Sequence, residues 1–246
     1  MSSNQSENTS EEIISIESFA DPKLSWKTMN DPVMGGRSTS SFSIQDGIGR
    51  FIGEVVNVPF LKSPGFITVR SAKDGDYPDV SSCHSLRLNV QAMKPYTGYR
   101  ISFGDKHVPG NRFAYGFKAD FQPPYDEIGP VDIPFTDFTV RWDDATGDAV
   151  VTCQENPKYC PDAKSLRNMK TISIWGEGVA GNVDLKIESI EALCGENVVI
   201  AHNSNSAKDM LFPKGVFSIV GLAAFVFIFA WKRLNGRRNQ EPYETI

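Results

Sequence analysis

The chain has 246 residues, of which 40% are hydrophobic and 22% charged, a composition typical of a globular protein with one large or two small domains. Gly 20 and Pro 15 interrupt it too often for long helices outside one C-terminal segment. The net charge is -5. Because Lys214 and the tail from Lys232 onward together carry +3, residues 1–213 carry -8. An acidic domain repels phosphate backbones, so we expect no nucleic-acid partner.

The N-terminal segment, residues 1–12, is polar and acidic, and we expect it to be disordered. It has neither the basic start and apolar core of a secretory signal nor the arginine-rich composition of a transit peptide.

The stretch from Trp26 to Ser38 reads WKTMNDPVMGGRS and is too specific for an ordinary loop. Its Asn-Asp-Pro run initiates a turn, and the two glycines after it allow close approaches that side chains would forbid. We interpret the stretch as a turn that closes the domain and buries Trp26 and Met34. The alternative is a direct partner-binding surface. The candidate binding residues are Trp26, Asn30, Asp31, Met34, Gly35, Gly36 and Ser38.

Short alternating runs separated by turn residues dominate residues 13–195. Strict alternation over residues 85–90 is repeated at 99–103 and 113–117, and about nine such runs occur. They predict an all-β domain built as an antiparallel sandwich, each sheet with one buried and one wet face.

Two sequence patterns resemble ligand sites but favour turns. Residues 176–181 match G-x-G-x-x-G, yet the next residues alternate like a strand where a dinucleotide site needs a helix, so we predict a glycine-rich β-turn and no nucleotide. Residues 143–148 hold three carboxylates without the spacing of a calcium loop. The three histidines have no triad or ligand spacing, so we expect no enzyme activity, no metal and no cofactor.

The four cysteines contain no Cys-x-x-Cys pair, which disfavours a zinc site. Cys153 and Cys160 flank a loop-like hexapeptide that a disulfide could close. The even number permits two bridges in an oxidising compartment, and free thiols in a reducing one are the alternative. Trp26, Trp142 and Trp175 are most simply packing residues, with sugar stacking by one of them as the alternative.

The C-terminal region carries one apolar run, residues 216–231, with Ser218 as its only polar residue. Extended back to Leu211, it is long enough for a transmembrane helix, with a buried core helix as the alternative. We therefore divide the region into a stalk (196–210), a membrane span (211–231) and a basic tail (232–246).

The basic tail predicts a cytosolic C-terminus, which places the domain on the other side of the membrane. That arrangement calls for a signal that residues 1–12 do not supply. Two interpretations follow: a single-pass type I protein of the secretory pathway whose first exon is missing from the sequence, or a tail-anchored protein with a cytosolic domain. A short span between basic residues is similar to mitochondrial outer-membrane anchors, so we expect a mitochondrial location first.

Several motifs together resemble the NADH:ubiquinone oxidoreductase (complex I) intermediate-associated protein family. They are the 26–38 stretch, Phe51-Ile52-Gly53-Glu54-Val55, Gly65-Phe66-Ile67-Thr68-Val69-Arg70, Asp79-Val80-Ser81, Leu86-Arg87-Leu88, Ile133-Pro134-Phe135-Thr136-Asp137-Phe138 and the glycine-rich close at 174–190. Their order agrees with the family over about residues 16–193. Residues 93–98, the insert at 153–170 and the C-terminal span depart from its pattern.

The resemblance implies a galactose-binding-like jelly-roll sandwich that is not an enzyme. It also implies an assembly chaperone that binds protein partners, among them respiratory complex I intermediates. We therefore expect a membrane-anchored assembly or scaffold factor. The alternative is a lumenal or extracellular module that binds a ligand such as a glycan.

Overall fold

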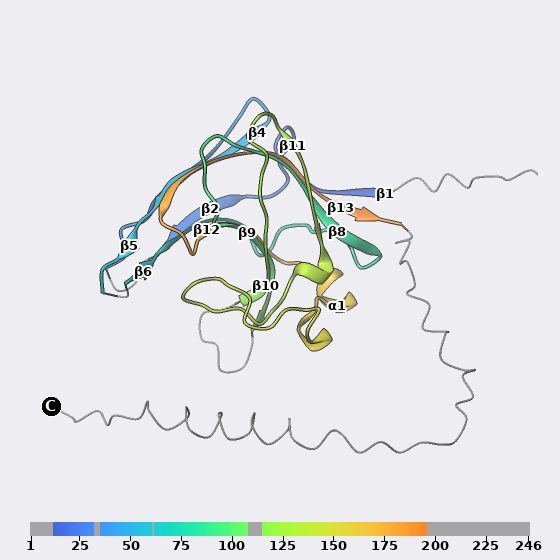
Figure 1. The fold of residues 1–246 in the computed structure, drawn as a ribbon. Helices are drawn as coiled ribbons and strands as arrows, with labels where there is room; N and C mark the ends of the chain where they lie inside the picture. The colour runs from blue at the N-terminus through green and yellow to red at the C-terminus, as the bar shows by residue number, and fades with distance from the viewer. Residues whose placement is uncertain (1–11, 32–34, 61, 108–114, 196–246) are drawn as a thin grey trace, which may run out of the picture. The chain divides into compact units, whose positions relative to one another are not determined.

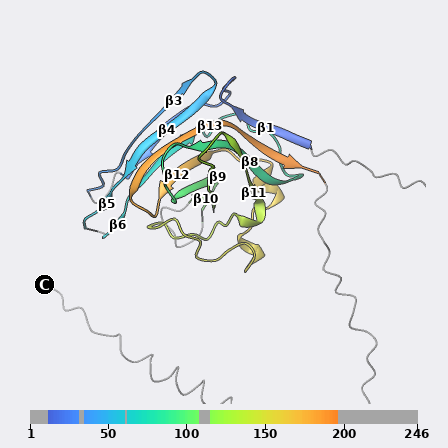
Figure 2. The same cartoon turned by 45° about the horizontal axis from the view of Figure 1, so that its top comes forward.

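The computed structural model describes residues 12–31, 35–60, 62–107 and 115–195. Within them the chain forms two antiparallel sheets that pack face to face, as Figures 1 and 2 show. Met34, the stalk, the expected membrane span and the basic tail lie outside the described residues. The helices that are described are single turns, and none has the length and apolar character needed to cross a membrane.

The first sheet runs in the order β11-β8-β13-β4-β3, and β1 pairs with the C-terminal half of β13. β13 is its longest strand, so β1 and β4 lie end to end along one edge of β13. The strands are β1 (Glu12–Ser18), β3 (Thr39–Gln45), β4 (Ile48–Val55), β8 (Cys83–Ala92), β11 (Gly129–Pro134) and β13 (Gly181–Cys194).

The second sheet runs in the order β10-β9-β12-β7-β2 and lies beneath the first in Figure 2. Its strands are β2 (Trp26–Asn30), β7 (Phe66–Ser71), β9 (Tyr99–His107), β10 (Tyr115–Asp120) and β12 (Ile172–Glu177). A small ribbon pairs β5 (Asn57–Val58) with β6 (Ser63–Pro64). The short helical turns are η1 (Phe135–Asp137), η2 (Pro157–Tyr159) and α1 (Ala163–Leu166).

The core lies between the two sheets and is built from alternate residues of each strand. These side chains are essentially inaccessible to water: Ile67 and Val69 of β7, Leu86, Leu88 and Val90 of β8, Ile101 and Phe103 of β9, Ile172 and Ile174 of β12, and Val183, Leu185 and Ile187 of β13. Period-two alternation in the sequence therefore identifies the inward face correctly. The all-β antiparallel sandwich is confirmed.

Two details differ from the sequence interpretation. Residues 26–30, read as part of a turn, form edge strand β2, because they pair along β7 from Trp26 to Asn30. The second sheet also has no fully wet face, because Arg100, Ser102 and Lys118 point away from the core and are nevertheless buried. The segment after η1 covers them: Thr139 bridges to Lys118, and the Trp142 indole donates to the Gly116 carbonyl at 3.1 Å.

A buried carboxylate ties the first connection to the sandwich. Glu17 is fully buried, and its oxygens accept hydrogen bonds from the backbone N–H groups of Lys23 and Leu24 and from the Trp26 indole at 2.9–3.0 Å. The Trp26 ring also packs against Phe19 at 5.6 Å between centroids. Trp26 is therefore a structural residue at the edge of the core.

Two disulfides close the domain. Cys83 of β8 is bonded to Cys194 at the end of β13, and Cys153 is bonded to Cys160, the pairing suggested by the hexapeptide between them. The first joins residues 111 apart in sequence and the second residues 7 apart. Chain-entropy arguments make the long-range bridge the stronger constraint on the unfolded chain.

We predict that removing the two bridges has unequal effects. Replacing Cys83 and Cys194 with alanine lowers the free energy of unfolding by about 4–5 kcal/mol, whereas the same change at Cys153 and Cys160 costs about 2 kcal/mol. Urea unfolding of the two double variants measures both values. Equal losses, or a larger loss at the short bridge, would contradict this assignment.

Candidate functional site

The outer face of the second sheet carries two rows of side chains that run across its five strands. Strand register places one row from β2 to β10 in the order Lys27, Arg70, Ser173, Ser102 and Lys118. The neighbouring row, in the same direction, is Met29, Thr68, Trp175, Arg100 and Asp120. Four cations and the Trp175 indole thus gather on one surface although they are scattered in the sequence.

Lys118 is clamped between two indoles at one end of these rows. Its Nζ lies 3.6 Å from the centroid of the Trp142 ring and 3.8 Å from that of Trp175, and it donates to Glu177 at 2.5 Å. The Lys118 side chain is 1% exposed and that of Glu177 8%. Burial lowers the pKa of Lys118, and the Glu177 carboxylate offsets part of that shift. The clamp fixes both rings by cation–π and ionic contacts at once.

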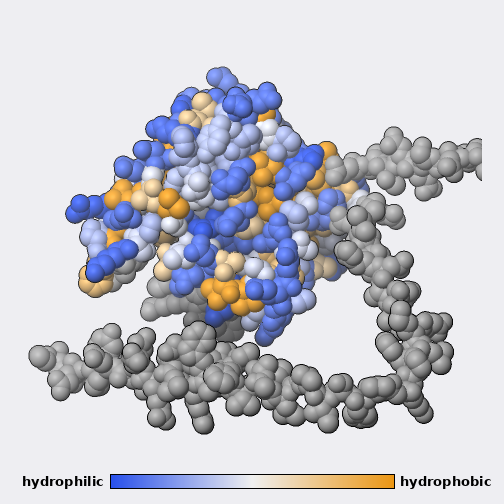
Figure 3. Space-filling model, in the orientation of Figure 1, coloured by the Kyte–Doolittle hydropathy of each residue, from blue (hydrophilic) through white to orange (hydrophobic). Residues whose placement is uncertain are grey.

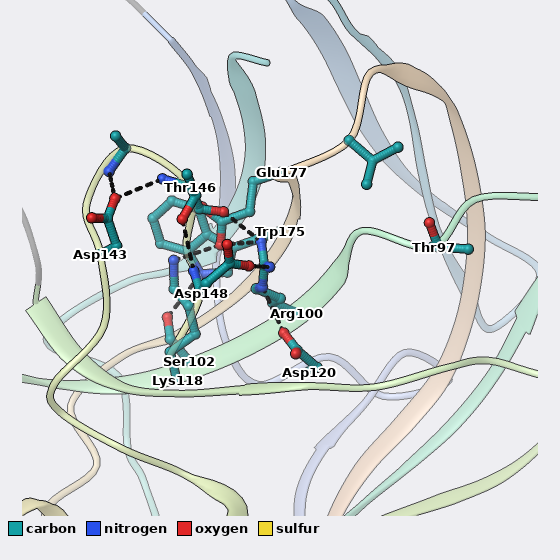
Figure 4. Close-up of polar contacts among 12 residues, drawn as sticks. Thr97, Arg100, Ser102, Lys118, Asp120, Asp143, Thr146, Asp148, Trp175 and Glu177 are labelled. Carbon is teal, nitrogen blue, oxygen red and sulfur yellow. Dashed lines mark hydrogen bonds and ion pairs between the residues drawn. The ribbon is translucent and has the colours of Figure 1, made fainter. Parts of the chain in front are cut away.

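Arg100 holds a second set of contacts beside the clamp. Its guanidinium donates to Asp120 at 2.6 Å, to Asp148 at 2.5 Å and to the Thr146 carbonyl at 2.8 Å, and lies 3.7 Å from Glu177. Figure 4 shows these groups converging on Arg100 from the sheet and from the 143–148 turn. Arg100 therefore fastens that turn to the edge of the site.

The 143–148 turn requires a glycine at the point where its backbone passes closest to Arg100 and Glu177. Gly147 has a φ of +79°, and a Cβ there would lie 2.5 Å from the Glu177 carboxyl carbon and 2.6 Å from an Arg100 nitrogen. Asp143 Oδ1 accepts from the backbone N–H groups of Ala145 and Thr146, which closes the turn from its other end. The carboxylates at 143 and 148 thus act in turn closure and ion pairing.

Two adjoining cavities open on this face and share Met29, Arg70 and Tyr115 in their walls. The smaller, about 370 Å³, is named here the tryptophan cavity; its other lining residues are Phe66, Ser102, Gly104, Trp142, Asp144, Ser173, Trp175 and Glu177. The larger, about 760 Å³, is named the basic cavity; its other lining residues are Ser25, Lys27, Thr28, Ser71, Ala72, Lys73, Asp74, Asp105 and Thr171. Together they form the cleft, the candidate binding site.

The rest of the described surface is a weaker candidate for a binding site. On the face drawn in Figure 3, apolar surface is divided into small patches separated by polar surface. Exposed large apolar residues such as Ile44, Phe60 and Val150 lie outside the linings of both cavities. Isolated residues of this kind are normal on soluble domains.

The 26–38 stretch does not form one site. Trp26 packs at the core edge, and Asn30 accepts from Ser40 Oγ at 2.6 Å. Ser38 is buried and accepts from the Val56 N–H at 3.1 Å. These contacts are structural and connect β2 to the start of β3 and the end of β4. Lys27, Thr28 and Met29 are the residues of the stretch that line the cleft, and Met29 lines both of its cavities.

Asp31 is the unusual member of that stretch. It is 6% exposed, and within the part of the chain that the structure describes neither carboxylate oxygen has a hydrogen-bond partner. Gly36 and Gly65 flank it so closely that a Cβ at either position would overlap the carboxylate. The close approach anticipated for the glycines is therefore present at Gly36, whereas Gly35 takes a left-handed φ of +79°.

The glycine-rich run at 176–181 is a turn between β12 and β13, as predicted, with no helix after it. Sequence analysis missed that its second residue, Glu177, anchors Lys118 and approaches Arg100. It also missed Arg70, Arg100 and Lys118 themselves. A signal was present, since each is a charged residue at an outward position of an alternating strand, but their convergence depends on strand register.

A family model supports a relationship over the first part of the domain. The model described as Complex I intermediate-associated protein 30 (CIA30) matches residues 17–152, which is more than half of the chain. No curated protein matches the chain significantly.

Solved structures similar to this one include a carbohydrate-binding module of family 11 from Clostridium thermocellum, in complex with a β-1,3-1,4-mixed-linked tetrasaccharide. It is 13% identical with a TM-score of 0.51, and the match covers 74% of this chain and 95% of the module. A family 11 module of the cellulosomal cellulase Lic26A-Cel5E from the same organism is 14% identical with a TM-score of 0.50, covering 76% and 96%. At such identities the likeness shows the jelly-roll fold alone.

We predict that Glu177→Gln destabilises the domain strongly. The change removes the counter-charge of a buried lysine, which costs about 3–5 kcal/mol. Asp120→Asn is the matched control, because the Asp120 side chain is 72% exposed and its ion pair contributes about 1 kcal/mol or less. Urea unfolding measures both, and equal losses would show that the Lys118 clamp is not a structural constraint.

A second prediction distinguishes the structural roles of Gly35 and Gly36. Gly36→Ala places a methyl group on the Asp31 carboxylate and lowers the free energy of unfolding by about 1–3 kcal/mol. Gly35→Ala meets no described atom within 4 Å and costs about 1 kcal/mol through its left-handed φ. Unchanged stability of the Gly36 variant, with loss of partner binding, would instead make this turn an interface.

Proposed function

Because this chain belongs to the Complex I intermediate-associated protein 30 (CIA30) family, we propose that it is an assembly or scaffold factor that binds a protein partner in the cleft and performs no chemistry on it. The observation that carries the proposal is the cleft itself: a surface of fixed aromatic and basic side chains held by the Lys118 clamp and by Arg100. A rigid, preformed surface reduces the ordering cost of binding.

The groups in the cleft favour binding over catalysis. Neither a histidine nor a cysteine is among the described residues that line it. Its buried ionisable groups are committed to one another, since Glu177 accepts from Lys118 and both are enclosed. General acid–base or nucleophilic catalysis needs such a group within reach of a substrate. This use of the charges supports a binding role.

The exposed residues of the cleft are of the types that contribute most to protein–protein binding. Met29 is 44% exposed and Tyr115 47%, and they stand beside Arg70 and Trp175. Tryptophan, tyrosine and arginine are enriched among residues that dominate binding energy, and methionine is enriched in interfaces generally. This composition supports a protein as the partner.

The two disulfides support a domain that faces an oxidising compartment. Together with the apolar run at 211–231 and the basic tail after it, they favour a single-pass arrangement with the tail in the cytosol. A tether of this kind raises the local concentration of the cleft near membrane-bound partners without any further contact. Complex I intermediates and clients of the secretory pathway are the two partner classes to distinguish.

A glycan is the second candidate ligand. The half-buried Trp175 ring lines a cavity beside the Ser102 and Ser173 hydroxyls, an arrangement that suits a sugar ring stacked on an aromatic face. The family 11 module from Clostridium thermocellum holds a tetrasaccharide on the same fold. A glycan array with the purified chain tests this candidate, and a flat array removes it.

We predict that a glutamate introduced at the rim of the cleft abolishes partner capture. In cells, Met29→Glu reduces crosslinking to the partner at least about tenfold, because it adds a charged chain where an apolar surface is buried on binding. Ile44→Glu is the matched control, since Ile44 is 40% exposed and lies on the other sheet. Quantitative crosslinking followed by mass spectrometry compares the two variants with the wild type.

The identity of the crosslinked proteins then separates the partner classes. Co-migration of the chain with partly built complex I on native gels supports the respiratory role. Capture confined to secretory proteins supports a lumenal scaffold. Capture that survives Met29→Glu, or that Ile44→Glu reduces equally, would contradict the cleft as the binding surface.

A further inference from the structure

Two cations that line the basic cavity lie on neighbouring strands. Lys27 of β2 and Arg70 of β7 are directly opposite partners in the strand register and share the outer face of the sheet. Within the described residues, the side chain of neither forms a hydrogen bond or an ion pair. Like charges placed directly opposite on neighbouring strands repel and destabilise the pairing. The repulsion between the two side chains therefore disfavours the free protein, and a bound anion would relieve it.

The other charges nearby are already committed. Asp105 lies 3.1 Å from both Lys73 and Lys170, whose ammonium groups hold the pKa of Asp105 below its usual range. Asp74 also lines the basic cavity but forms no ion pair with Lys27 or Arg70 among the described residues. Arg100 and Lys118 are occupied by Asp120, Asp148 and Glu177. Among the residues that the structure describes, Lys27 and Arg70 are thus the cations of the cleft that remain open to a ligand.

Arg70 also stands where the two cavities meet. It lines both, and on the adjoining strand Trp175 lies two residues beyond Ser173, the register partner of Arg70. Diagonal neighbours across a strand pair are about 7–8 Å apart, within reach of a ligand that carries an anion beside an apolar group. A guanidinium binds a carboxylate through two parallel hydrogen bonds, which fixes orientation as well as charge.

We propose that the cleft recognises an acidic segment of its protein partner: a carboxylate binds between Lys27 and Arg70, and a neighbouring apolar side chain enters the tryptophan cavity. This inference rests on the proposed binding role of the cleft and specifies the chemistry that the cleft selects. A protein segment is favoured over an acidic glycan because Met29, Phe66, Trp142 and Trp175 give the tryptophan cavity a largely apolar wall. Because the domain is acidic overall, an acidic segment is attracted only where Lys27 and Arg70 stand, and salt weakens that attraction by screening the charges.

The test uses the purified full-length chain and defined probes. Short synthetic peptides in which Glu or Asp alternates with Leu and Phe are compared with amide twins that carry Gln and Asn. Oligoglucuronate and a neutral β-1,3-1,4-glucan tetrasaccharide form the glycan arms. Isothermal titration calorimetry gives the dissociation constant of each probe, at low salt and at about 0.5 M salt, where charge contacts are screened.

We expect the acidic peptide to bind at least about tenfold more tightly than its amide twin, and the advantage to disappear at high salt. Lys27→Glu and Arg70→Gln each remove that advantage. Lys94→Glu, an exposed lysine in the connection between β8 and β9, leaves it intact. Thermal unfolding confirms that each variant is folded, and the exposed position of Lys27 keeps the test valid if Arg70→Gln does not fold.

Four results overturn the inference: equal binding of the acidic peptide and its twin, an advantage that survives both cleft variants, binding of oligoglucuronate alone, or binding of no probe. The proposed function fails separately, when crosslinking in cells does not depend on Met29. Met29-dependent capture together with equal peptide binding would retain the cleft as the interface and reject its selectivity for carboxylates.

Discussion

The buried ammonium of Lys118 is the constraint on which the candidate site depends. A lysine is rarely enclosed unless its charge is paired. Here the pairing group is the Glu177 carboxylate, which accepts a hydrogen bond from the Lys118 ammonium and is itself buried. The two indoles that enclose Lys118, those of Trp142 and Trp175, are thereby fixed, and both line the tryptophan cavity. Stability and site geometry are thus two consequences of one contact.

Buried charges also hold the segment that covers part of the outer face of the second sheet. Residues after η1 cross β9 and β10, and Arg100 fastens them through Thr146 and Asp148. At the far end, on β2 and β7, Lys27 and Arg70 stand side by side and line the basic cavity. The sheet therefore has a closed end, where charges stabilise the fold, and an open end, where charges are available to a partner. The boundary between the two ends is the place where the tryptophan and basic cavities meet.

Much of the fold could be predicted from the sequence because period-two alternation reports burial on the inner face directly. Leu86, Leu88 and Val90 are an example, and all three lie in the core. The family resemblance was equally accessible, since its motifs are local and contiguous. Edge strand β2 was not, because its polar residues show no alternation and only its pairing with β7 defines it.

The candidate site was hidden from the sequence for a physical reason. Arg70, Arg100, Lys118 and Trp175 come from four strands, and only the register between those strands brings them together. The 26–38 stretch is the most unusual local sequence, yet its Trp26, Asn30 and Ser38 make contacts within the sandwich. Lys27, Thr28 and Met29 of the same stretch do line the cleft, but as part of edge strand β2, which only its pairing with β7 defines.

Indole N–H signals in two-dimensional ¹H–¹⁵N NMR spectra of the full-length chain test the central claim most directly. The Trp175 Nε1–H donates to Ser102 Oγ at 2.8 Å inside the cleft. The Trp26 Nε1–H donates at 2.9 Å to Glu17, a fully buried carboxylate at the edge of the core, so this indole reports on the interior of the sandwich. Addition of a partner that the chain captures in cells is predicted to shift the Trp175 signal and to leave that of Trp26 unchanged. A shift of Trp26 alone, or of neither signal at saturation, would contradict the cleft on the second sheet as the binding site.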